Sequence, residues 1–141
     1  MEAVPRRGPV ELRAHTRHLG PFLPTLRGGA DAAEQWLQKP TTAVIAYNDL
    51  MAIGFIQAVT AAGWDVPADV SVIGFDNIVD GTLVEPHLTT IAAPLVSLGS
   101  AAVARLVKSR SKDRAESEEP VLLPARLVVR GSTGPRLASR V

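Results

Sequence analysis

Two polar pairs in this sequence have the residue types needed to bind a small ligand: Asn48-Asp49 and Asp76-Asn77. Each pair directly follows a short apolar run. An amide offers both hydrogen-bond donors and an acceptor, and a carboxylate accepts two hydroxyl protons. Asn48 and Asp76 together would therefore suit the vicinal hydroxyl groups of a sugar or a nucleoside.

The same two pairs have other possible roles. Asn48 or Asp49 can N-cap a helix that begins at Leu50, and Asp76-Asn77 can stabilise a turn. Use of Asp49 and Asp76 as a catalytic acid and base would need unequal environments for the two carboxyl groups. No nucleophile elbow and no phosphate-binding glycine loop accompanies them. We therefore expect a binding protein rather than an enzyme and assign no catalytic residue, while capping and turn formation remain open as alternatives.

Metal and nucleic-acid sites find little support in the residue pattern. Asp76, Asp80 and Glu85 do not have the spacing of a calcium loop, the three histidines are not grouped with carboxylates, and cysteine is absent. Residues 41–104 contain six acidic residues and no Lys or Arg, so this part of the chain lacks the cations that phosphate contacts require. We expect no metal and no cofactor, and we interpret the C-terminal arginines, Arg130 among them, as a solvated edge.

The periodicity of the apolar residues indicates which elements position the two polar pairs. A strand, a helix and a second strand form a β-α-β unit, which predicts parallel strands and a right-handed connection. Parallel strands would bring the two pairs to one edge of the sheet, where open α/β sheets bind ligands. The fold class is therefore α/β, with a Rossmann-like parallel sheet flanked by helices. The predicted elements are helices at 28–38, 50–62 and 95–109, strands at 43–47, 70–75, 88–94 and 125–131, and a charged loop at 109–120.

Length and composition fit one globular domain. The chain has 141 residues, of which 46% are hydrophobic and 21% charged, with a formal net charge of +1. No apolar stretch reaches the length of a membrane helix, and the first residues lack the apolar core of a signal peptide. We therefore expect a cytoplasmic protein without a membrane partner.

Three stretches resemble the effector-binding domain of lac-repressor-like (LacI/GalR) transcription regulators: TTAVIAYNDLMAIGFIQAVTAAGWDVPADVSVIGFDNI, PHLTTIAAPLVSLGSAAVARLV and LPARLVVRGSTGP. The resemblance covers residues 24–135, leaving 1–23 unassigned and 136–141 as a tail. It implies the fold of type I periplasmic sugar-binding proteins, in which two α/β lobes close over a small effector. We expect this chain to be mainly the second lobe of a truncated regulator that lacks the DNA-binding helix-turn-helix head. The alternative is a periplasmic sugar-binding protein of a transporter.

The resemblance also implies roles for individual residues. Asn48 and Asp76 match positions that hydrogen-bond the effector, which we expect to be a sugar. Asp49 and Leu95 are further candidate ligand-binding residues, of which Asp49 also supports the adjacent turn and helix and Leu95 lines the pocket. The helix at 50–62 and the segment near residues 83–86 resemble the family's dimer contact, so we expect a homodimer. The predicted dimer residues are Leu50, Ile53, Gly54, Gln57, Leu83 and Val84. Because the first lobe is largely missing, the apolar face of the helix at 95–109 should be exposed or covered by something else.

Overall fold

A computed structural model describes residues 16–110 and 122–135 of the 141-residue chain. The tail expected at 136–141, nearly all of the charged loop expected at 109–120, and residues 1–15 of the unassigned segment lie outside the described residues. Residues 16–24 contain no helix or strand, and the two prolines there, Pro21 and Pro24, lack the backbone N–H that regular elements use.

The sheet has four strands in the order β1-β2-β3-β4, with β1 at Ala43–Ile45, β2 at Ser71–Phe75, β3 at Thr89–Ala92 and β4 at Arg126–Val128. β1, β2 and β3 are parallel, which confirms the predicted β-α-β unit. β4 runs antiparallel to β3, so the sheet is not wholly parallel. The chain leaves β3 at its carboxyl end and re-enters the sheet at the same edge, since Ala92 pairs with Arg126. The returning strand must therefore run backwards.

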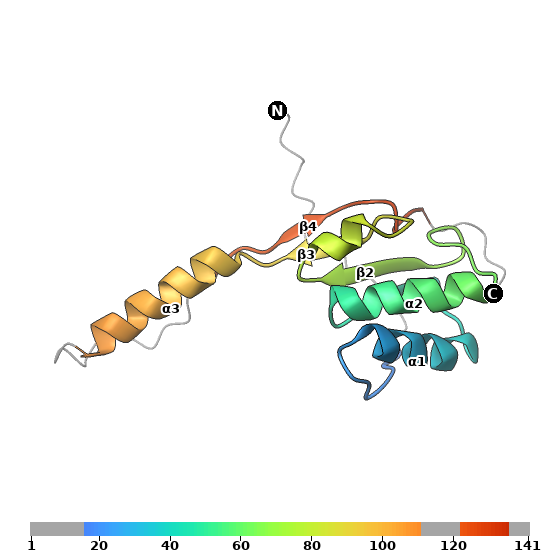
Figure 1. The fold of residues 1–141 in the computed structure, drawn as a ribbon, viewed down its shortest axis with the longest axis horizontal. Helices are drawn as coiled ribbons and strands as arrows, with labels where there is room; N and C mark the ends of the chain where they lie inside the picture. The colour runs from blue at the N-terminus through green and yellow to red at the C-terminus, as the bar shows by residue number, and fades with distance from the viewer. Residues whose placement is uncertain (1–15, 111–121, 136–141) are drawn as a thin grey trace, which may run out of the picture.

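Two helices lie in layers on one face of this sheet, with α2 (Asp49–Ala61) between the strands and α1 (Leu26–Leu37) (Figure 1). The core fills the space between these layers, and its largest fully buried side chains include Trp36, Phe55 and Leu88. The rings of Trp36 and Phe55 meet edge to face, with their centroids 5.4 Å apart. The predicted α/β class is confirmed.

The start of α1 lies two residues before the predicted position, at Leu26 rather than 28. Thr25 caps the helix, and its Oγ1 accepts a hydrogen bond from the backbone N–H of Gly28 at 3.1 Å. Gly28 and Gly29 are poor helix formers in isolation, yet both are buried in the first turns of α1. A Cβ on Gly29 would collide with the carbonyl oxygen of Met51, so close packing against α2 explains the glycine there.

The ends of the other elements differ slightly from their predicted positions. α2 begins and ends one residue earlier than expected, and each strand is shorter than its apolar run. The sequence pattern did not predict the 3-10 helix at Val79–Thr82, which follows the polar pair at the end of β2. No helix in the described ranges is long and apolar enough to span a membrane.

The helix α3 (Leu95–Arg110) projects away from the sheet and from the two other α-helices (Figure 1). Its apolar side chains are exposed, one of the two outcomes expected for this helix: Val96 is 85% and Leu106 66% exposed. In a helix of a folded domain, apolar side chains along one face normally pack against a core.

Candidate functional site

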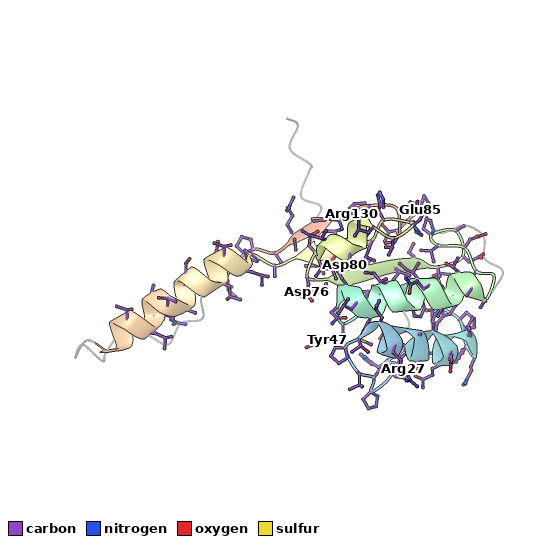
Figure 2. All side chains as sticks on the ribbon, in the orientation of Figure 1. Arg27, Tyr47, Asp76, Asp80, Glu85 and Arg130 are labelled. Carbon is purple, nitrogen blue, oxygen red and sulfur yellow. The ribbon has the colours of Figure 1, made fainter. Side chains whose placement is uncertain are left out.

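The polar pairs that follow β1 and β2 lie at the same edge of the sheet. β1 and β2 are neighbours, with Ile45 paired to Ile73, so their carboxyl ends meet. Figure 2 shows Tyr47 and Asp76 at the same end of the domain, where α2 begins. The backbone N–H of Ile78 donates a hydrogen bond to Oδ2 of Asp49 at 2.9 Å and so joins the two strand ends directly.

Asn48 caps α2 and also contacts the segment before α1. Its Oδ1 accepts a hydrogen bond from the backbone N–H of Met51 at 2.9 Å, and its Nδ2 donates one to the carbonyl oxygen of Pro24 at 3.2 Å. The capping alternative is therefore what the structure shows for Asn48. An amide has two N–H donors and two acceptor lone pairs, so one donor and one lone pair remain for a ligand.

Asp49 is fully buried beneath this edge. Its Oδ1 accepts a short hydrogen bond of 2.6 Å from Oγ1 of Thr90, in addition to the bond that Oδ2 accepts from Ile78. A Cβ on Gly74 would collide with Oδ1 of Asp49, so the glycine leaves room for the carboxylate. This geometry makes Asp49 a support for the site rather than a group that faces a ligand.

Asp76 is exposed and has a backbone conformation that is unusual for an L-residue. Its φ is 109° and that of Asn77 is 55°, so two consecutive residues without glycine are left-handed. The backbone N–H of Asp76 donates to the carbonyl oxygen of Ile91 at 3.0 Å. The carboxylate itself makes no hydrogen bond to the residues that the structure describes, which leaves both oxygens available to a ligand.

Arg130 was expected at a solvated edge, and this prediction is wrong. Its side chain is half-buried; Nη2 donates to Oδ1 of Asn77 at 2.6 Å, and Nη1 donates to the carbonyl oxygen of Leu88 at 2.7 Å. The two partners lie 53 and 42 residues away in the sequence. No local pattern in the chain could have indicated either contact.

Apolar side chains are exposed at the same edge. Leu95, the first residue of α3, is 61% exposed, and Phe75, at the end of β2, is 38% exposed. Tyr47 is 79% exposed and directly precedes Asn48, although no pattern in the sequence indicated a role for it. An aromatic ring beside polar groups is the usual composition of a small-molecule site.

The residues predicted for a dimer contact fall into two groups. Leu50, Gln57 and Leu83 are exposed and Val84 is half-buried. Ile53 and Gly54, by contrast, are buried within the chain itself, and a Cβ on Gly54 would collide with the carbonyl oxygen of Leu26 in α1. These two residues pack in the core, so their assignment to a dimer contact is wrong.

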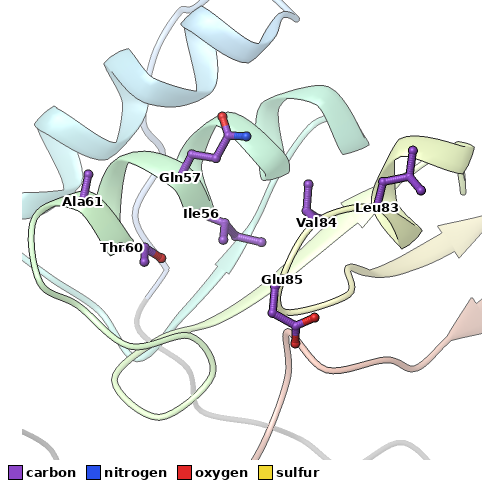
Figure 3. A pocket seen from close by; sticks show the side chains of 7 residues that line it. All are labelled: Ile56, Gln57, Thr60, Ala61, Leu83, Val84 and Glu85. Carbon is purple, nitrogen blue, oxygen red and sulfur yellow. The ribbon is translucent and has the colours of Figure 1, made fainter.

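A shallow groove of about 480 Å³ lies between the outer face of α2 and the segment that follows the 3-10 helix (Figure 3). It includes three of the predicted dimer residues, Gln57, Leu83 and Val84. Its lining residues are Ile56, Gln57, Thr60, Ala61, Leu83, Val84 and Glu85.

The acidic side chains do not form a metal site in the described part of the chain. Residues 16–110 and 122–135 contain no group of three or more His, Asp or Glu side chains that could hold an ion. Glu85 contacts His87 at 3.9 Å, and both side chains are largely exposed. The carboxyl edge presents the hydrogen-bonding groups of Asn48 and Asp76 beside the apolar surfaces of Tyr47 and Leu95.

The pattern of the periplasmic binding protein-like domain family matches residues 9–133. The chain belongs to this family. Within it, the predicted LacI relationship is confirmed, since the HTH-type transcriptional regulator MalR of Streptomyces coelicolor is 43% identical over 109 residues. Those residues make up 77% of this chain and 31% of MalR, so the chain spans about a third of the length of this relative.

Solved structures of LacI-family regulators have the same fold as this periplasmic binding protein-like domain. A regulator from Enterococcus faecium with bound ribose aligns with a TM-score of 0.68 and 36% identity, over 82% of this chain and 42% of that chain. A regulator from Arthrobacter sp. FB24 in complex with lactose aligns with a TM-score of 0.68 and 37% identity, over 80% and 43%. These relatives are transcriptional regulators rather than enzymes or transporter components.

Proposed function

We propose that this LacI-family domain binds a sugar effector and provides the dimer contact of a cytoplasmic DNA-binding transcription regulator. The observation that carries the proposal is the exposed carboxylate of Asp76, held next to the capped start of α2 on a scaffold similar to ribose- and lactose-bound structures. Operator DNA would be contacted by a separate helix-turn-helix domain.

The chemistry of the edge suits a sugar. The two oxygens of Asp76 can accept hydrogen bonds from adjacent hydroxyl groups, and the remaining donor of Asn48 can reach a hydroxyl oxygen. The exposed ring of Tyr47 and the side chain of Leu95 offer apolar surface to the C–H groups of the sugar ring. Effector binding would bias the protein toward one of its conformations and so alter DNA affinity through the dimer.

Removal of the Asp76 carboxylate tests the effector site. Asp76→Ala in the full-length protein should weaken binding of ribose or lactose by about ten- to hundredfold, because hydrogen bonds to a charged group are lost. Isothermal titration calorimetry measures the affinity. Asp31→Ala, at an exposed position on α1, removes the same charge away from the edge and should leave affinity unchanged. Equal affinity of the Asp76 variant and the wild type would exclude Asp76 from the site.

The dimer contact is tested separately at the groove of Figure 3. Leu83 is 77% exposed, so Leu83→Glu should not disturb the core. A carboxylate buried in a dimer contact should weaken association by about tenfold or more. Sedimentation velocity of the full-length protein measures this shift, with Leu23→Glu, at a position that is 74% exposed before α1, as the matched control. A dimer of unchanged strength would mean that this groove is not the contact.

A further inference from the structure

We propose that Arg130 is a positioning residue that acts through Asn77 to hold the turn that presents Asp76. The importance of this role for binding rests on the proposed function, whereas the role itself concerns only the conformation of the turn. Arg130 does not need to touch the effector. Arg130 follows β4, which ends at Val128, and its side chain reaches across to the turn.

The turn needs support because it contains two left-handed residues in succession. Non-glycine residues with φ of 109° and 55° are uncommon, although Asp and Asn tolerate this region better than most. Such conformations are strained and persist only where the surroundings hold them. They would otherwise relax and move the carboxylate of Asp76.

Four hydrogen bonds hold the turn. Three are made by its backbone: the N–H of Asp76 donates to the carbonyl oxygen of Ile91 at 3.0 Å, that of Asn77 to Oγ1 of Thr90 at 3.3 Å, and that of Ile78 to Oδ2 of Asp49 at 2.9 Å. Arg130 makes the fourth and shortest, 2.6 Å from Nη2 to Oδ1 of Asn77. It is the only one of the four made to the Asn77 side chain.

The guanidinium group is itself held at Leu88, the residue directly before β3. Its Nη1 donates to the carbonyl oxygen of Leu88 at 2.7 Å, and the backbone N–H of Arg130 donates to Oγ1 of Thr89 at 2.9 Å. A guanidinium presents its donors in a rigid fork, which lets one side chain connect Leu88 to the turn. Lysine would provide the charge but not the two fixed directions. Since residues 41–104 contain no Lys or Arg, this cation has to come from another part of the chain.

Arg130 affects binding through the fraction of molecules whose turn is in the binding conformation, not through contacts with the effector. If the turn is held less tightly, Asp76 spends less time in its binding conformation. The apparent affinity for an effector then falls in proportion to the fraction of molecules in that conformation. Arg130 thus adds to the affinity without appearing among the groups that contact the ligand.

Hydrogen exchange of the full-length protein without effector tests the inference. In Arg130→Lys and in Asn77→Ala, the amides of residue 77 and of Ile78 should exchange about tenfold faster or more, because a charge-assisted hydrogen bond is lost. The amides of Ile56 and Val59 in the buried part of α2 should be unaffected. Arg126→Lys, at an exposed position on β4 in the same segment of the chain, is the matched control and should exchange like the wild type.

Two further variants separate positioning from a general effect on the fold. Arg130→Lys added to Asn77→Ala should produce no further acceleration, since the contact is already absent. Asn77→Asp keeps an acceptor for Arg130, so its amide exchange should resemble that of the wild type. This variant tests the contact even where Arg130→Lys is globally unstable. Unchanged exchange in Arg130→Lys, additive effects in the double variant, or exchange in Asn77→Asp as fast as in Asn77→Ala would each overturn the inference.

Titration of the same proteins with ribose and lactose separates this inference from the proposed function. Slower exchange in the wild type than in Arg130→Lys, together with no sugar binding by the wild type, supports the positioning role and counts against the effector assignment of Asp76. Sugar binding by the wild type with identical exchange in the Arg130 variant supports the effector site and overturns the positioning role.

Discussion

The buried carboxylate of Asp49 is the residue on which the candidate site depends most. It joins the start of α2, the turn after β2 and the strand β3, through its bonds with Ile78 and Thr90. Gly74 leaves the space that this carboxylate occupies. A residue at a strand–helix junction thus holds together segments that are far apart in the sequence.

Asp49→Asn should lower the free energy of unfolding by about 1–3 kcal/mol, the usual cost of leaving buried polar groups poorly paired. The amide nitrogen is a donor, so it cannot replace a carboxylate oxygen that accepts from the backbone of Ile78 or from the hydroxyl of Thr90 without a rearrangement. Urea denaturation measures the change. Asp31→Asn on the exposed face of α1 is the control and should be neutral; a neutral Asp49→Asn would contradict the proposed support.

At the scale of whole elements, the contact between α1 and α2 depends on two glycines. Gly29 of α1 faces the carbonyl oxygen of Met51, and Gly54 of α2 faces that of Leu26. Backbone thus approaches backbone in both directions across the helix pair. The glycines let α1 pack closely on one side of α2, and the sheet covers the other side of this apolar helix.

Gly54→Ala should destabilise the domain by about 1–3 kcal/mol, because the added methyl group collides with backbone that cannot rotate away. Gly99 in α3 offers a matched control, since a Cβ there meets nothing within 4 Å. Gly99→Ala should leave the unfolding free energy unchanged or raise it slightly through helix propensity. Chemical denaturation of both variants checks the contrast, and equal stability of the two would show that the helix contact tolerates the extra volume.

Element types could be predicted from the sequence because apolar periodicity and capping residues are local signals. The parallel pairing of the first two strands and the shared edge of the two polar pairs followed from the β-α-β unit. The covered side of α2 could not be predicted, since a helix with apolar residues all round gives no preferred face. Ile53 and Gly54 were assigned to a dimer contact from the resemblance to the family, and no periodicity in α2 indicated that they belong to the core. The contact of Arg130 with Asn77 joins residues that only the folded sheet brings together.

At the scale of the whole molecule, one face of the sheet carries exposed apolar side chains. Ile45 is 77%, Phe75 38% and Leu127 54% exposed, and Phe75 and Leu127 both neighbour Ile91 across the strands. Parallel sheets are normally covered on both faces. The exposed apolar residues of α3 lie away from this face, so the described residues carry exposed apolar side chains on two separate surfaces.

Substitution on this face should improve the behaviour of the chain produced alone. Ile45→Thr combined with Leu127→Thr should raise its soluble concentration and lower its fluorescence with the apolar dye ANS, because threonine keeps the strand propensity but removes apolar surface. Val72→Thr is the control on the opposite, buried face and should reduce stability instead. If the double variant binds as much dye as the wild type, the exposed sheet face is not the source of the signal.

The pairing of Ala92 with Arg126 makes β3 and β4 a β-hairpin whose connection contains the whole of α3. Two antiparallel strands can be joined by as few as two residues, so the geometry of the sheet sets no requirement on the length between 93 and 125. The register of the hairpin is fixed by the pairs within it and by the bonds of Arg130 and Ser132 to β3 and its neighbours. The sheet that carries the site therefore tolerates substitutions, insertions and deletions in this connection. Only the contacts of α3 limit such changes.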